Sequence, residues 1–90
     1  MPANVLGMDT QMGVDCANFF GSQADALTQI SANLKTKLNG FDWFGPDADA
    51  ARTTQFTDVE TQLKNAAIKL NDMKAKLLAQ AKEQSDASAK

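Results

Sequence analysis

Apolar side chains in the first half of the chain recur at spacings of three and four residues. This spacing places them on one face of an α-helix, and the pattern extends from about Asp9 to Asn39. Asn and Gly commonly end helices in the left-handed conformation, so we expect the helix to stop at Asn39 and Gly40. The apolar stripe consists of Met12, Cys16, Phe19 or Phe20, Leu27, Ile30, Leu34 and Leu38.

A second apolar stripe, in the other half of the chain, follows the a and d spacing of a heptad repeat. We expect its helix to begin near Pro46, because Pro is tolerated at the first helical position. The carboxylates of Asp47 and Asp49 also favour the positive start of a helix. The second stripe consists of Phe56, Val59, Leu63, Ala66, Leu70, Met73 and Leu77.

The order of these elements predicts an all-α fold in a single domain. Two long helices joined by a short turn at 40–46 bury their stripes by folding back on each other. This gives an antiparallel helical hairpin over 9–82. The terminal segments 1–8 and 83–90 lack the helical period and are expected to be flexible.

Two helices shield each other on one side only, so we expect the hairpin to dimerise into a four-helix bundle. The main stripes supply the first candidate interface residues, namely Phe20, Leu27, Ile30, Leu34, Leu63 and Leu70. A weaker second face holds the small residues Ala17, Gly21, Ala24 and Thr28, with Ile68 on the other helix. Small residues allow close helix approach, and the alternative is that a solvated face merely tolerates them.

Charged residues are interspersed along the chain, with a formal net charge of −2. No basic cluster could neutralise a row of phosphates, so nucleic acid is not an expected partner. Pairing about the turn would bring Lys35 and Lys37 to the level of Asp47 and Asp49. These exposed pairs contribute little, and no like-charge contact opposes the hairpin.

The residues needed for common catalytic chemistry are missing, so we do not expect an enzyme, a cofactor or a metal site. The sequence contains no His and no Tyr, which removes the commonest general base. Cys16 is the single Cys and lies on the apolar stripe, where packing is the expected role. No apolar run approaches the ~20 residues that span a bilayer, and 1–7 lacks the features of a cleavable signal peptide.

The predicted turn is the most distinctive segment of the sequence. Phe41, Trp43 and Phe44 include the single Trp of the chain and two of its five Phe residues. One interpretation is that these aromatics close the open end of the hairpin, while Gly45 permits a backbone conformation that a Cβ would resist. The other is recognition, because loops carry binding functions and a Trp is a common binding anchor.

With Trp43-Phe44-Gly45 near mid-chain between two long amphipathic helices, the sequence resembles the ESAT-like WxG family of small secreted helical hairpins. The segment 46–52 is also similar to the stretch that follows the turn in many actinobacterial members. The resemblance implies a four-helix bundle of two hairpins and a recognition role for Trp43 and Gly45. It further implies export in the folded state from the cytoplasm, without a cleavable signal, by a type VII (ESX) secretion system with a membrane-bound ATPase.

One feature of that family is missing, because its export is usually associated with a Tyr-x-x-x-Asp/Glu signal after the second helix. Near that place the chain reads Leu78-Ala79-Gln80-Ala81-Lys82-Glu83. The resemblance therefore implies a heterodimer in which a second WxG protein supplies the Tyr signal. The alternatives are a homodimeric secreted WxG protein and an intracellular helical adaptor not linked to export.

Overall fold

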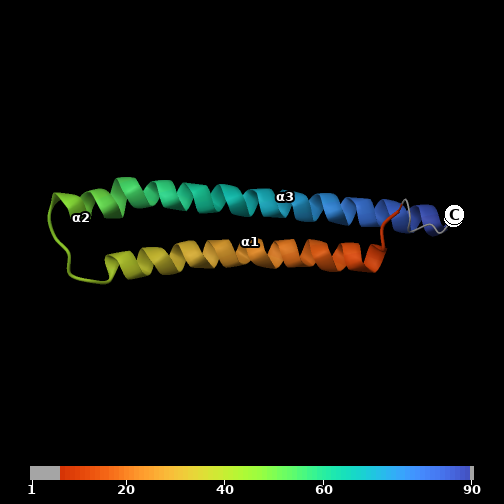
Figure 1. Cartoon of the computed structure of the whole chain (residues 1–90), viewed down its shortest axis with the longest axis horizontal. Coiled ribbons are helices and arrows are strands. Elements are labelled where there is room, and N and C mark those ends of the chain that lie inside the picture. The colour runs from red at the N-terminus through yellow and green to blue at the C-terminus, as the bar shows by residue number, and fades with distance from the viewer. Residues whose placement is uncertain (1–6, 90) are drawn as a thin grey trace.

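The protein is an antiparallel helical hairpin, as Figure 1 shows. A computed structural model describes residues 7–89, so most of the segment 1–8 that was predicted to be flexible lies outside the described residues. Helix α1 spans Thr10–Asn39. The second arm consists of α2 (Pro46–Ala50), a π-helical turn η2 (Ala51–Gln55) and α3 (Phe56–Ala89) without a break. The molecule measures 67 × 17 × 17 Å, which is the shape of two helices side by side.

Both ends of α1 are capped, although not entirely as predicted. Asp9 accepts a hydrogen bond from the backbone N–H of Met12 at 3.1 Å, which is a typical N-cap. The helix ends at Asn39 as predicted, but Gly40 has φ −96° and so is not left-handed. Instead, its N–H donates to the carbonyl of Lys37 at 3.2 Å in a final tight turn.

The register of the two arms differs from the predicted one, in which residues pair symmetrically about the turn at 40–46. Lys35 Nζ lies 3.6 Å from Glu60 Oε2, and the side chain of Lys74 lies over Gly21. In both pairs the midpoint in residue number falls just after Asp47 and not within the turn. The reason is that α2 and η2 extend beyond the end of α1 (Figure 1). The prediction that Lys35 and its neighbour Lys37 lie at the level of the aspartates of α2 is therefore wrong.

The seam between the arms is formed by small residues. The buried residues of α1 are Gly13, which the side chain of Met8 covers, and Ala17, Gly21 and Ala24. A Cβ at Gly21 would come within 2.9 Å of Cδ of Lys74, so the two arms approach closely there. The small residues Ala17, Gly21 and Ala24 were predicted to face a partner chain, and this is wrong because they are buried within the hairpin itself.

The predicted main stripe of α1 is correspondingly turned outward. Met12 and Phe19 are 69% and 62% exposed, and Ile30 and Leu34 are each 45% exposed. Cys16 is exposed as well, which contradicts its predicted role in packing within the chain. The periodicity correctly separated two faces of α1, the large apolar side chains and the small residues. The face of small residues is the one that meets α3, because the two backbones can approach most closely there.

We call the side of the hairpin that carries Ala32, Lys64 and Asn71 the polar side. A groove of about 570 Å³ there is lined by these residues and also by the apolar side chains of Leu27 and Ile68, among others. Each successive residue turns by about 100° around the helix axis. In each helix, the residues that flank the buried strip on the side away from the groove therefore lie together on the opposite side of the hairpin. We call that side the apolar face, and helix geometry assigns to it Phe20, Ile30, Leu34, Val59, Leu63, Leu70 and Met73.

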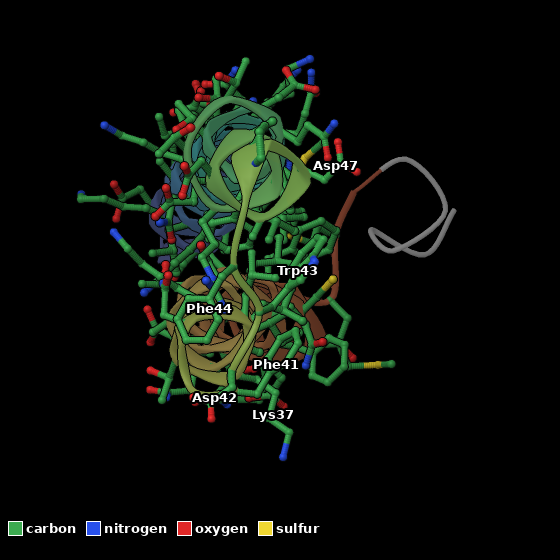
Figure 2. The ribbon with its side chains drawn as sticks, turned by 90° about the vertical axis from the view of Figure 1, so that its left-hand side faces the viewer. Lys37, Phe41, Asp42, Trp43, Phe44 and Asp47 are labelled. Carbon is green, nitrogen blue, oxygen red and sulfur yellow. The ribbon has the colours of Figure 1, made fainter. Side chains whose placement is uncertain are left out.

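Figure 2, an end-on view from the turn, agrees with this division because its sulfur atoms lie on the right-hand side. Among the side chains that the structure describes, no large one is fully buried. The buried apolar residues there are five alanines and Phe56. The hairpin therefore leaves the apolar face partly exposed and has little core of its own.

Helix α3 continues to Ala89, past the point at which the sequence predicted a flexible tail. Lys82 Nζ contacts Asp86 Oδ2 at 2.9 Å within this segment. Ser85 and Asp86 line a groove together with Thr10, so the end of α3 still runs beside the start of α1. The apolar period ends near Glu83, but the Ala, Gln, Lys and Glu residues that follow Leu78 favour helix without it.

Replacing Ala24 by Leu is expected to destabilise the hairpin, because the larger side chain would force α1 and α3 apart. Overpacking of this kind costs about 1–3 kcal/mol of unfolding free energy. Thermal unfolding followed by circular dichroism measures the loss. Ala79→Leu, at an exposed position of α3, is the matched control and should leave the midpoint unchanged. Equal melting of the two variants would contradict the seam.

Candidate recognition site at the turn

The turn climbs from the end of α1 to the start of α2, which projects beyond α1 (Figure 1). Gly45 has φ 111°, a conformation that favours glycine, as the turn was expected to require. Pro46 follows as the first residue of α2, in agreement with the predicted helix start. The segment 41–44, between the end of α1 and Gly45, forms neither helix nor strand.

Arg52 holds the turn in this conformation. Its guanidinium donates three hydrogen bonds to backbone carbonyls: Nε to Leu38 at 3.1 Å, Nη1 to Trp43 at 2.6 Å and Nη2 to Phe41 at 2.8 Å. The first acceptor lies in the last turns of α1 and the other two lie in the connecting segment. Arg52 therefore ties the end of α1 and the turn to the second arm.

The same guanidinium lies over two aromatic rings. The Arg52 Cζ atom is 5.4 Å from the ring centroid of Phe41 and 5.8 Å from that of Trp43. The two rings stack on each other with centroids 6.0 Å apart and planes 13° from parallel. Cation–π contacts at this distance contribute about 0.5–1 kcal/mol at exposed sites, so the stacked rings and the hydrogen bonds favour the same conformation.

The π-helical turn η2 explains how Arg52 reaches this position. The backbone N–H of Phe56 donates to the carbonyl of Ala51, the i−5 bond that defines a π-turn. In a regular helix, residues four apart drift around the axis, since a turn takes 3.6 residues. A π-turn takes more residues, which offsets this drift between Arg52 and Phe56. Ala48 and Phe56, four residues before and after Arg52, are buried.

The aromatic residues of the turn are divided between its two sides. Trp43 and Phe41 lie on the right in Figure 2, the side of the apolar face, and Phe44 lies on the left with Asp42 below it. Leu34, Leu38 and Phe41 line a groove of about 750 Å³ beside the turn, so the apolar face continues into it. Trp43 is half-buried, whereas Phe44 is 84% exposed, more than any other large apolar side chain in the described chain.

The sequence identified this turn as the candidate site. Of its two motif residues, the structure brings Trp43 together with Arg52, whereas the carbonyl of Gly45 accepts a hydrogen bond from the backbone N–H of Asp49 at 3.1 Å. Arg52 was not identified as a candidate, although it is the single Arg of the chain. Ile68, predicted as a weaker interface residue, is 48% exposed and lines the polar-side groove.

Three further properties of this chain concern metal sites, membrane-spanning helices and similarity to known proteins. Within residues 7–89 no group of three or more Asp, Glu, Cys or His side chains could hold a metal ion. None of the helices in this described part is both long enough and apolar enough to cross a membrane. No family model, curated protein or solved structure matches this chain.

Replacing Arg52 by Gln is expected to loosen the turn while the hairpin remains folded. Loss of its charged hydrogen bonds should lower the unfolding free energy by about 1.5–3 kcal/mol. Because Trp43 is the single Trp and the chain has no Tyr, its fluorescence reports the turn directly. Its emission should shift to longer wavelength as the ring becomes hydrated. Lys69→Gln, which removes an exposed charge from α3, is the control, and an identical spectrum for both variants would refute this role.

Proposed function

We propose that this chain is a WxG protein that is exported by a type VII secretion system as one half of a helical-bundle dimer. The observation that carries the proposal is the combination of an uncovered apolar face with a preorganised Trp43-Phe44-Gly45 turn at its end. An isolated hairpin has no other means of burying that face. The WxG turn adds the resemblance to secreted hairpins, which links the dimer to export.

The apolar face supports dimerisation on energetic grounds. Burying a large apolar side chain contributes about 1.5–3 kcal/mol, and the face offers Leu, Ile, Val, Phe and Met side chains from both arms. Ile30, Leu34 and Val59 are each more than 40% exposed in the hairpin. A second hairpin placed on this face would give a four-helix bundle with the large core residues that one hairpin lacks.

The proposed partner is a second WxG hairpin that carries the Tyr signal, because the 90 residues of this chain contain no Tyr. The chain has its turn at one end and the start of α1 beside the end of α3 at the other. An antiparallel dimer would therefore place the second-helix end of the partner beside Trp43. In that arrangement the two halves of the signal, the turn and the Tyr motif, would lie next to each other.

Native mass spectrometry of the chain co-expressed with the product of the neighbouring gene should show a heterodimer. Leu34→Asp is expected to weaken it about 100-fold or more, since a buried unpaired charge costs about 3–5 kcal/mol. Ala32→Asp places the same carboxylate on the polar side and should leave the dimer intact. A homodimer that is indifferent to the neighbouring product would rule out the heterodimer.

Replacing Trp43 by Ala is expected to reduce export at least tenfold while the dimer still forms. The half-buried ring should cost about 1.5–2.5 kcal/mol of hairpin stability, roughly half of the value for a fully buried Trp. Fractionation of culture supernatants, in strains with and without the secretion ATPase, measures export. Thr36→Ala, at an exposed position of α1, is the control. Normal export of a well-folded Trp43→Ala chain would defeat the recognition role.

A further inference from the structure

The turn presents aromatic side chains in two opposite directions, and a single partner on the apolar face would meet one set of them. Phe41 and Trp43 lie on the side of the apolar face (Figure 2), and Phe41 lines the groove into which that face continues. Phe44 lies on the opposite side with 84% of its surface exposed. A second hairpin on the apolar face would therefore leave Phe44 uncovered.

The direction in which Phe44 points is determined by contacts that do not involve its own ring. Arg52 holds the carbonyls of Phe41 and Trp43, on either side of Asp42. Gly45 follows at φ 111°, a conformation that other residues rarely adopt. Since the backbone on both sides of Phe44 is restrained, a binding partner would not have to order it, and this lowers the entropic cost of docking.

We propose that Phe44 is a docking anchor for a third protein chain, distinct from the chain that covers the apolar face. Its ring would enter an apolar pocket, as aromatic anchors do at protein interfaces. The exposed carboxylate of Asp42 lies on the same side of the turn (Figure 2), so the pocket that fits this surface has Lys or Arg at its rim. Arg52 is the positioning residue that keeps the anchor on this side.

The distinction between two partner chains rests on the dimer proposed above. Photocrosslinking in cells of the source organism tests whether Phe44 and the apolar face contact different chains. The photoreactive amino acid p-benzoylphenylalanine replaces Phe44 in one full-length chain and Leu34, on the apolar face, in another. A third chain carries it at Gln29, an exposed position away from both surfaces. We expect position 44 to crosslink to a chain of different mass from the one captured at position 34, and position 29 to capture neither.

Second-site variants test the chemistry of the anchor. Asp42→Lys and Arg52→Gln should each reduce the adduct at position 44 at least fivefold and leave the adduct at position 34 unchanged. Arg52→Lys keeps the charge but not the fork of donors, so it should restore the adduct only in part. The unchanged adduct at position 34 shows in the same cells that the variant is folded and dimeric.

Three results would overturn the proposal: no adduct from position 44, the same captured chain from positions 44 and 34, or an adduct at 44 that persists in Arg52→Gln. Failure of the proposed function is read separately. Suppose that the chain is exported without the secretion ATPase and that position 44 still captures its partner in a strain that lacks this ATPase. This result supports the anchor and counts against the type VII assignment. Loss of the adduct at position 34 alone counts against the dimer.

Discussion

Close contact between the two arms along a seam of small residues is the constraint on which the rest of the structure depends. Gly21 and the buried alanines of α1 have no bulk to offer, so the second arm can approach until the stem of Lys74 lies over Gly21. This contact sets the register of the hairpin. It also decides which residues of each helix are turned away from the seam and are left for another molecule.

The register has a direct consequence at the turn. Because α3 pairs with α1 from Phe56 onward, the residues that precede it in the second arm extend past Asn39. The segment that connects α1 to α2 must run alongside this extension, which brings the carbonyls of Phe41 and Trp43 within hydrogen-bond distance of Arg52. Arg52 itself lies in the π-helical turn at Ala51–Gln55. The arrangement of Phe41, Trp43 and Arg52 at the turn is thus a product of how the two arms are aligned.

Much of this architecture could be predicted from sequence. The end of α1 at Asn39 and the start of α2 at Pro46 follow from local residue preferences, since helix caps depend on nearby backbone groups. The positive φ of Gly45 was expected for the same reason. Arg52 could not be assigned a role, because its hydrogen-bond acceptors become neighbours only when the turn has folded.

The sequence by itself determined that the protein is a pair of long helices with an aromatic turn between them. Helix period, propensity and capping act over a few residues, and the sequence displays them directly. Only the tertiary structure decided which stripe of each helix meets the other. Periodicity marks Met12 and Leu34 as one stripe and Ala17 and Ala24 as another, and hydrophobicity alone favours the first as the contact. The close approach of the two backbones decides otherwise: the alanines form the contact, because large side chains would hold the helices apart.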